Sequence, residues 1–267
     1  CERCIRDRSL VRVAHAMSPP RPVVAVRRGV RVSVVHGSLA FAEHRVAVGH
    51  YEGDSIVGAE AYLDLVLGGR LSARQALGLY PGAVGSHALF DHPAPRGKPP
   101  GALVVGLGQV GGLTPSLLKA SFARALLELA RREIERRAPP GAAAGGPIEI
   151  TLSCLLIGTG AGGIAVQDSV LALLRGVCEA NRVLEQSGQA EQAYIAAIEL
   201  IELWEDRAIA ATHALRRSQQ DPELSGVFEI GERLRQGSGG NRGAPAAADD
   251  QAWWLRLQVR ADEEGAL

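Results

Sequence analysis

Aromatic residues are scarce in this sequence. Phenylalanine, tryptophan and tyrosine together make up 4% of its 267 residues, although apolar residues as a whole reach 46%. That apolar share is ordinary for a globular protein, so leucine, valine, isoleucine and alanine must build the core. The length is sufficient for one large domain, or for one domain with attached segments.

The sequence also lacks a surplus of charge and long apolar runs. Its 29 lysines and arginines are balanced by 29 aspartates and glutamates. A general nucleic-acid-binding protein is usually basic, so we expect no nucleic-acid partner. No apolar run reaches the roughly 18 residues of a membrane span. The arginines near the beginning of the chain are not followed by the apolar region of a signal peptide. We therefore expect no membrane association.

Four cysteines are too few for a disulfide framework in a chain of this length. Cys1 and Cys4 form a lone C-x-x-C pair, and a zinc site needs four ligands, so we expect no metal. Cys154 and Cys178 fall in apolar segments, where free thiols are usually buried. This cysteine usage is typical of a reducing compartment and predicts a cytoplasmic protein. The sequence suggests no cofactor.

The two ends of the sequence differ from its middle. Residues 1–29 are rich in arginine and proline, and residues 237–250 are rich in glycine and alanine, so both are expected to be linkers. The alternating run Trp253–Val259 resembles the first half of a hairpin, and the chain does not begin with methionine. We therefore expect a fragment of a longer protein. Its predicted parts are a basic tail or linker at 1–29, an α/β domain at 30–217, and a linker with the start of a following β segment at 218–267.

The middle of the chain alternates strands and helices. Its clearest unit is an apolar strand at Ile148–Ile157, a glycine loop, and a helix that begins near Gln167 or Asp168. Strands apolar on both faces are typical of a parallel sheet that is covered on both sides. The pattern therefore predicts an α/β sandwich with a mostly parallel sheet. The other predicted strands are 31–35, 46–51, 86–90, 102–105 and 194–203 (a helix being the alternative for the last), and the other predicted helices are 55–67, 115–137 and 205–217.

Two glycine loops match the pattern G-x-G-x-x-G between a strand and a helix. A dinucleotide-binding fold requires an acidic residue about 20 positions after the glycine loop, at the end of the next strand. Counting from the two loops reaches Glu128 and Glu179, and both lie inside predicted helices. In the second loop Ile164 and Ala165 stand where a P-loop has lysine and serine or threonine. The glycines either allow tight turns or expose backbone N–H groups to an anion. The candidate ligand-binding residues are Gly106, Gly108, Gly158, Thr159, Gly160, Ala161, Gly162 and Gly163.

His50, Glu52 and Asp54 follow one another at the end of a predicted strand. A histidine beside carboxylates can transfer protons, so these three residues are the candidates for catalysis, and His36 at a neighbouring strand end could join them. The alternative is a polar strand end with solvated side chains, since no nucleophile or set of metal ligands completes the group.

Several motifs occur in an order that resembles a known family. The segments Val46–Gly53, Leu67–Leu71 and Val104–Gly108 resemble the macro-like N-terminal domain of the zinc leucine aminopeptidases. The segments His36–Leu39 and Asp54–Glu60 and the loop Gly158–Gly163 are more distantly similar to ADP-ribose-binding macro domains. The resemblance implies a three-layer α/β/α macro-like sandwich. Some stretches are also similar to modules of long bacterial proteins with a caspase-like CHAT domain.

The sequence departs from both families at functional positions. Ser38 stands where macro domains commonly have an acidic residue that contacts adenine, and Gly58 stands where they have an asparagine used for ribose binding and hydrolysis. The metal-binding half of the aminopeptidases has no counterpart, so a peptidase is not expected.

The sequence thus leaves three hypotheses about function. The first is a non-catalytic macro-like module of a larger bacterial protein that binds a phosphate-bearing, ADP-ribose-like ligand or self-associates as a homo-oligomer. The second is a hydrolase of ADP-ribosyl or nucleotide-phosphate bonds. The third is a scaffold attached to a caspase-like protease, with the other domains of the same polypeptide as its partners.

Overall fold

The computed structural model describes residues 29–137, 146–160, 163–231 and 233–242. The predictions for residues 1–28 and for the Trp253–Val259 run fall outside this part of the chain, as do Ala161 and Gly162 of the second glycine loop. The strands are β1 (Val30–His36), β2 (Arg45–His50), β3 (His87–Asp91), β4 (Gly101–Gly106), β5 (Ile148–Cys154), β6 (Ala193–Glu202), β7 (Phe228–Ile230) and β8 (Arg235–Gln236). The helices are α1 (Gly58–Val66), α2 (Arg70–Ala76), α3 (Pro115–Arg137), α4 (Val166–Gln186) and α5 (Glu205–Ser218), with a 3₁₀ turn η1 at Leu39–Phe41.

All of the strands belong to one sheet. Its order is β3-β4-β2-β5-β6-β1-β7, and β8 also pairs with β1. The pairing is antiparallel between β3 and β4 and parallel for every other pair of these strands. The mostly parallel sheet predicted from the sequence is therefore confirmed, with its antiparallel strand at one edge.

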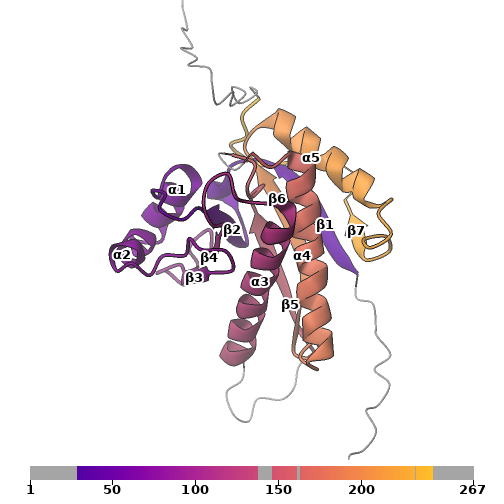
Figure 1. The fold of residues 1–267 in the computed structure, drawn as a ribbon, viewed down its shortest axis with the longest axis horizontal. Helices are drawn as coiled ribbons and strands as arrows, with labels where there is room; N and C mark the ends of the chain where they lie inside the picture. Colours follow the sequence, from indigo (N-terminus) through magenta and orange to yellow (C-terminus); the bar gives the residue numbers. More distant parts are fainter. Residues whose placement is uncertain (1–28, 138–145, 161–162, 232, 243–267) are drawn as a thin grey trace, which may run out of the picture.

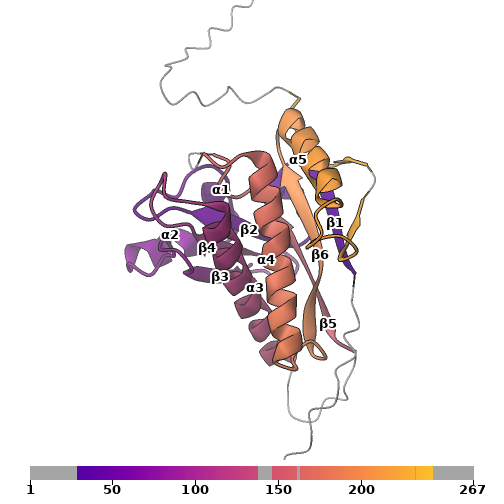
Figure 2. The ribbon, with the colours of Figure 1, turned by 45° about the vertical axis from the view of Figure 1, so that its right-hand side comes forward.

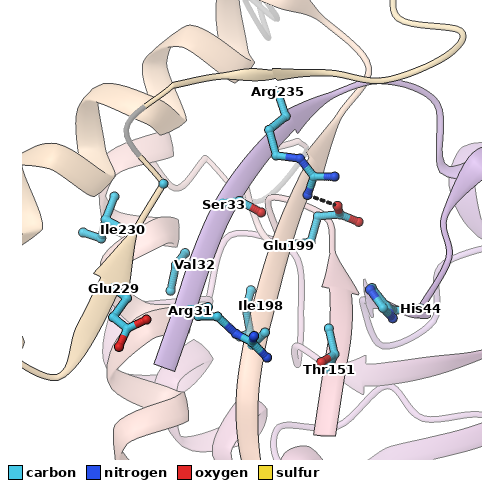
Figure 3. Close-up of a pocket in the computed structure, with 12 residues that line it drawn as sticks. Arg31, Val32, Ser33, His44, Thr151, Ile198, Glu199, Glu229, Ile230 and Arg235 are labelled. Carbon is cyan, nitrogen blue, oxygen red and sulfur yellow. Dashed lines mark hydrogen bonds and ion pairs between the residues drawn. The ribbon is translucent and has the colours of Figure 1, made fainter. Parts of the chain in front are cut away.

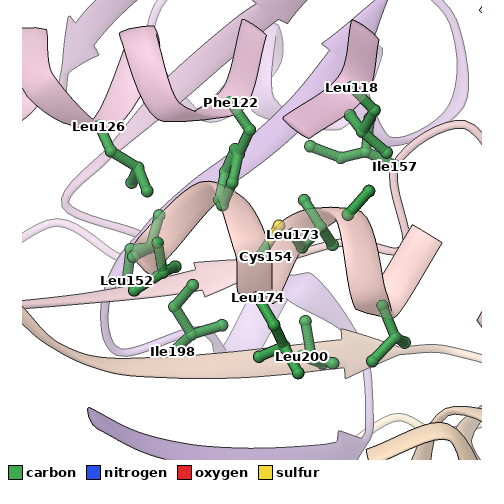
Figure 4. Packing of buried hydrophobic residues seen from close by; sticks show 14 of the residues in the cluster. Leu118, Phe122, Leu126, Leu152, Cys154, Ile157, Leu173, Leu174, Ile198 and Leu200 are labelled. Carbon is green, nitrogen blue, oxygen red and sulfur yellow. The ribbon is translucent and has the colours of Figure 1, made fainter. Parts of the chain in front are cut away.

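Helices cover both faces of the sheet, which confirms the predicted three layers. The long helices α3, α4 and α5 lie side by side on one face (Figures 1 and 2). They bury the larger core with inward residues of β1, β4, β5 and β6, including Phe122 and Leu173 against Leu152 and Leu200 (Figure 4). On the other face, α1 and α2 pack over β2, β4 and β3 through a smaller core. The side chains of adjacent strand residues separate into these two cores because they alternate between faces.

Most element boundaries agree with the sequence patterns. The helix α3 spans Pro115–Arg137 as predicted, with the hydroxyl of Thr114 accepting a hydrogen bond from the Leu117 N–H. The segment predicted as a strand at Tyr194–Leu203 forms β6, which spans Ala193–Glu202, and is not a helix. The strand predicted at Ile148–Ile157 is shorter, because after Cys154 the chain leaves the sheet and turns, with the Thr159 N–H donating to the Leu156 carbonyl.

Two regions contain more structure than the sequence predicted. The seven-residue α2 was not predicted, and β7 and β8 lie where a linker was expected. These two strands have three and two residues, too few for an alternating pattern to be visible. They pair with β1, so the sheet continues beyond residue 217. Within the described residues, no helix is both long and apolar enough to cross a membrane.

Candidate functional site

The two central strands β2 and β5 lie side by side, and the chain leaves them toward opposite faces of the sheet. After β2 it continues to α1 on one face, and after β5 it continues to α4 on the other. In an open parallel sheet such a reversal creates a crevice outside the carboxyl ends of the strands, and ligands bind there. We refer to the site between residues 51–57 on one side and residues 155–160 and 163–165 on the other, where this rule places a ligand, as the carboxyl-edge crevice.

One wall of this crevice is the second glycine loop, which short hydrogen bonds hold in place. The Thr159 hydroxyl donates to the Leu156 carbonyl at 2.8 Å, and the buried Ser169 hydroxyl donates to the Ile157 carbonyl at 2.7 Å. Gly158 has a φ of +83°, and a Cβ there would lie 2.8 Å from Cδ2 of Leu113. Glycine is required at this position because another residue would be strained and crowded. Thr159, Gly160 and Gly163 remain half-buried or exposed.

The loop leads directly into the N-terminus of α4. The residue before the helix, Ala165, has an extended backbone and makes no side-chain capping bond. The first N–H groups of a helix have no partner within it, and together they carry a partial positive charge. A glycine loop followed by such an uncapped helix end is a common arrangement for binding an anion.

A cation lies against the same loop. Nη2 of Arg207, in the first turn of α5, donates to the Thr159 carbonyl at 3.1 Å and to its hydroxyl. Nε of Arg207 lies 3.8 Å from the carboxylate of Glu202 at the end of β6. Burial raises the pKa of the Glu202 carboxyl, while the Trp204 N–H and the charge of Arg207 act in the opposite direction. Arg207 therefore holds the loop and adds positive charge beside it.

Tyr51, directly after β2, supplies a buried polar group at this end of the sheet. Its side chain is 7% exposed and belongs to the same buried cluster as Leu113, Leu156 and Ile164, which come from both glycine-containing segments. Its hydroxyl has no hydrogen-bond partner among the described residues. Buried hydroxyls nearly always have a partner, so this one is suited to a ligand or an ordered water. Burial also raises the pKa of the Tyr51 hydroxyl, which keeps it a donor.

The first glycine loop is arranged differently. The N–H groups of Gly106, Leu107 and Gly108 donate to the carbonyls of Ser86, His50 and Gly82 at 2.7–2.9 Å. A Cβ at position 106 would lie 2.2 Å from the Ser86 hydroxyl, so close packing alone explains that glycine. A ligand-binding role for Gly106 and Gly108 stays a prediction. In the second loop, the N–H groups of Thr159, Gly163 and Ile164 likewise donate within the loop, to the carbonyls of Leu156, Gly160 and Gly158 at 3.2–3.4 Å.

The structure separates the three candidate catalytic residues. His50 is 4% exposed, and its Nδ1 lies 3.0 Å from Oε2 of Glu60, whose other oxygen accepts a hydrogen bond from the Tyr80 hydroxyl at 2.7 Å. Glu52 and Asp54 are exposed and lie outside this group. Glu60 and Tyr80 were not singled out from the sequence, although a glutamate on the apolar side of a short helix was a usable signal. His36 does not join His50, because its ring contacts Gln236 and Asn241.

A separate groove of about 570 Å³ lies on the part of the sheet that α1 and α2 do not cover. Figure 3 shows its lining from β1, β5, β6, β7 and β8, with Arg31, Thr151 and Arg235 among the labelled residues. The carboxylate of Glu199 accepts from Arg235 at 2.9 Å and from the Ser153 hydroxyl at 3.0 Å. Glu199 and Arg235 are thus paired with each other, and Arg31 lies 3.6 Å from the carboxylate of Glu149. Within the described part of the chain, no group of three or more histidine, cysteine or acidic side chains could hold a metal ion.

Comparison with known proteins shows that the fold of this chain is similar to that of several solved structures. No protein-family model matches the sequence, and no curated protein matches it. Solved structures that resemble it include the Trypanosoma brucei macrodomain in complex with ADP, with 15% identity, a TM-score of 0.47 and 69% of each chain covered. The Oceanobacillus iheyensis macrodomain with MES bound has 13% identity and a TM-score of 0.44, covering 71% of this chain and 91% of that one. The macrodomain of DarG from Mycobacterium tuberculosis has 14% identity and a TM-score of 0.41, covering 64% of this chain and 98% of that one. The function of this chain therefore has to be inferred from its own residues.

Proposed function

We propose that this chain is a non-catalytic, macro-like binding module that holds a phosphate-bearing ligand in the carboxyl-edge crevice, as part of a larger bacterial cytoplasmic protein. The observation that carries the proposal is the second glycine loop, which leads into the uncapped N-terminus of α4 at the reversal point between β2 and β5. Arg207 supplies a positive charge beside the loop, and the Tyr51 hydroxyl supplies an unused donor. These groups favour an anionic ligand with hydroxyl-bearing parts, such as a nucleoside diphosphate sugar.

Binding without catalysis is favoured by the surroundings of His50. A general base must reach a proton of the substrate directly or through one water. His50 is instead buried beneath α1 and paired with Glu60. The described crevice residues place no other histidine beside the glycine loop.

Isothermal titration of the chain with ADP-ribose tests the proposal. ADP-ribose is a suitable probe because a second structure of the Trypanosoma brucei macrodomain holds that ligand. The variant Gly160→Glu adds a negative charge to the loop at a position where a Cβ meets no atom within 4 Å. Gly146→Glu is a matched control, because it is equally open but lies before β5, at the opposite edge of the sheet.

We expect micromolar binding by the wild-type chain and by Gly146→Glu, and at least a tenfold loss in Gly160→Glu. Binding that is equal in all three proteins would place the ligand elsewhere. No heat with ADP-ribose at high protein concentration, together with no heat from inorganic pyrophosphate, would contradict the proposal.

Self-association is a second candidate function that a different observation favours. Leu65, Leu77 and Leu79, in and after α1 and α2, are 77%, 73% and 61% exposed. Exposed leucines that lie close together often mark interaction sites, and the helices α1 and α2 contact each other. Sedimentation equilibrium of the chain and of Leu65→Glu tests this: assembly that depends on concentration and is weakened in the variant would support it, and a monomer at all concentrations would exclude it.

A further inference from the structure

Part of one face of the sheet has no helix over it. The helices α1 and α2 pack on β2, β3 and β4, whereas α4 and α5, which follow β5 and β6, lie on the opposite face. Among the described residues, much of β5, β6, β1 and β7 is therefore left without a covering helix on the side of α1 and α2. This is unusual, because parallel strands in the middle of a sheet are normally covered on both faces.

The side chains on this uncovered face are small or polar. In register across the strands, Thr151 lies opposite Ala197 and Ala197 opposite Arg31. The next row on this face is Ser153, Glu199 and Ser33. A face that receives a helix of the same domain would be apolar at such positions. These strands are instead suited to water or to a polar ligand.

Two grooves on this face meet. The groove of about 570 Å³ described above extends over β7, β1, β6 and β5. A second groove, of about 440 Å³, begins at the first residues of β5 and β2 and reaches the segment 91–100 and the last turns of α3. His44 and Thr151 line both grooves, so we treat the two as one site and call it the trough.

The trough is long enough for a linear ligand of several units. Each of its grooves alone has a volume in the range of about 300–1,000 Å³ that is typical of ligand pockets. The three strand spacings from β7 to β5 span about 14 Å, and the trough continues past His44.

Almost every charge in the trough has a partner of opposite sign. The only charged lining side chain without a partner among the described residues is that of Glu229. The pairs are Arg235 with Glu199 at 2.9 Å, Arg31 with Glu149 at 3.6 Å, Arg45 with Asp91 at 2.6 Å, Arg136 with Glu133 at 3.3 Å and Lys98 with Glu43 at 2.6 Å. A strongly charged ligand of either sign would have to displace one of these partners. The trough therefore favours a ligand without net charge.

Capacity for neutral hydrogen bonds remains. The hydroxyls of Ser33 and Thr151 and the ring of His44 make no hydrogen bond to another described residue. A carboxylate can accept about four hydrogen bonds and a guanidinium can donate about five. Glu199 accepts two and Arg235 donates one of these, so both groups keep unused capacity. Apolar surface lies among these polar groups, from Val32, Ile198, Ile230, Pro95 and Pro100.

We propose that the trough binds a neutral oligosaccharide. A sugar ring carries hydroxyl groups that both donate and accept at its rim and C–H groups on its two faces, and the lining of the trough offers partners for both. An extended peptide fits less well, because it binds along a free strand edge or places side chains in apolar pockets, and the trough lies across the strands. This site is separate from the carboxyl-edge crevice, and the proposal does not depend on the function proposed there.

NMR titration of the full chain tests the proposal. The neutral probes are maltohexaose, cellohexaose and N-acetylchitohexaose, the charged sugar is hexagalacturonate, and the peptide is a hexapeptide of alternating lysine and glutamate. Shifts of the Thr151 and Ala197 amide signals report binding in the trough. The variant Thr151→Lys places a long side chain where the two grooves meet, and His44→Ala removes a ring that lines both. Ser225→Lys is the control, because this residue is exposed and lies outside both grooves.

We expect at least one neutral hexasaccharide to bind the wild-type chain with a Kd of about 1 mM or lower, and the control to agree within about a factor of two. Binding should be at least about tenfold weaker in Thr151→Lys and about threefold weaker in His44→Ala. If circular dichroism shows that Thr151→Lys is unfolded, His44→Ala decides alone, because its ring holds no other described residue.

Three results would overturn the proposal. The first is no shift with any neutral hexasaccharide at about 10 mM, ten times the expected Kd. The second is equal affinity in the wild type and the folded trough variants, which would place the sugar elsewhere. The third is tighter binding of hexagalacturonate or of the peptide than of every neutral sugar. None of these results would change the phosphate-binding function proposed for the carboxyl-edge crevice.

Discussion

Nδ1 of His50 lies 3.0 Å from Oε2 of Glu60, and both side chains are buried between the sheet and α1. The Tyr80 hydroxyl donates to the second oxygen of Glu60 at 2.7 Å, and its ring meets the His50 ring edge to face at a centroid distance of 4.7 Å. Three segments of the chain are thus joined through one carboxylate. The arrangement holds α1 on β2, and with it the segment that forms the second wall of the crevice.

Replacing Glu60 by alanine is expected to destabilise the protein strongly. The change leaves the His50 ring and the Tyr80 hydroxyl buried without their partner, and unsatisfied buried groups of this kind cost about 1–3 kcal/mol each. We expect the free energy of unfolding in urea to fall by about 3 kcal/mol at pH 7. Glu52→Ala, at an exposed position, is the control and should change it by less than about 0.5 kcal/mol. Equal effects of the two substitutions would show that the buried carboxylate stabilises nothing.

A second carboxylate, Asp91 at the end of β3, is surrounded by arginines. Its oxygens accept from Arg45 at 2.6 Å, from Arg132 at 2.7 Å and from Arg136. Burial acts to raise the pKa of the Asp91 carboxyl, but the hydrogen bond and charge of Arg45, together with Arg132 and Arg136, outweigh it and hold the pKa below its usual range. The ionised form is therefore the one that stabilises the fold.

Asp91→Asn should accordingly have an effect that depends on pH. Because the native pKa is lowered, the stabilisation is fully present above the unfolded value of about 3.9 and is lost as the pH falls toward the native value. We expect the variant to be about 2 kcal/mol less stable than the wild type at pH 7, and the difference to shrink at pH 3. Urea unfolding at both pH values measures this. A stability difference of the same size at both pH values would mean that the charge of Asp91 is not its source. As a control, Glu128→Gln breaks an exposed ion pair with Arg131 and should lower the free energy of unfolding by less than about 1 kcal/mol.

Long elements were predictable from the sequence because their patterns repeat. The 23 residues of α3 and the ten residues of β6 give many turns or alternations, and a threonine and a proline mark the start of the helix. Short elements could not be found in this way. The strands β7 and β8 exist because β1 offers them an edge to pair with, which is a tertiary contact and not a local preference.

The candidate site was predictable only where it is local. The glycines of residues 158–163 are sufficient to predict the loop. The strand before it and the helix after it place the loop at the carboxyl ends of the strands. The partners of His50 and His36 come from distant segments: Tyr80 follows His50 by 30 positions, and Gln236 follows His36 by 200. No spacing rule connects such residues, so the group of His50, Glu60 and Tyr80 and the contact of His36 with Gln236 both required the structure.

The two cysteines within the described residues should be unreactive in the native protein. Burial raises the pKa of the Cys154 thiol strongly, and burial with the nearby charge of Glu223 raises that of Cys178 to about 11. The thiolate is the reactive form, so little of it exists near neutral pH. We expect Cys1→Ser/Cys4→Ser protein to react with a thiol reagent at pH 7.5 at least a hundredfold more slowly when folded than in 6 M urea. Fast labelling of the folded protein would show that one of the two thiols is accessible.

The glycines of the two loops should respond differently to one added methyl group. A Cβ at position 106 meets the Ser86 hydroxyl at 2.2 Å and the Ala83 carbonyl oxygen at 2.3 Å, whereas a Cβ at position 160 meets nothing within 4 Å. Overpacking of a tight position costs about 1–3 kcal/mol, so Gly106→Ala should lower the free energy of unfolding by that amount, and Gly160→Ala should change it by less than about 0.5 kcal/mol. Urea unfolding compares the two directly. Gly160→Glu then separates a role in binding from a role in packing. If the second loop holds the phosphate, this variant should lose the ligand and keep normal stability, because it changes the charge of the loop without disturbing its packing. A large loss of stability in Gly160→Ala would mean that the second loop, like the first, is glycine-rich for packing, and would remove the main support for a ligand there.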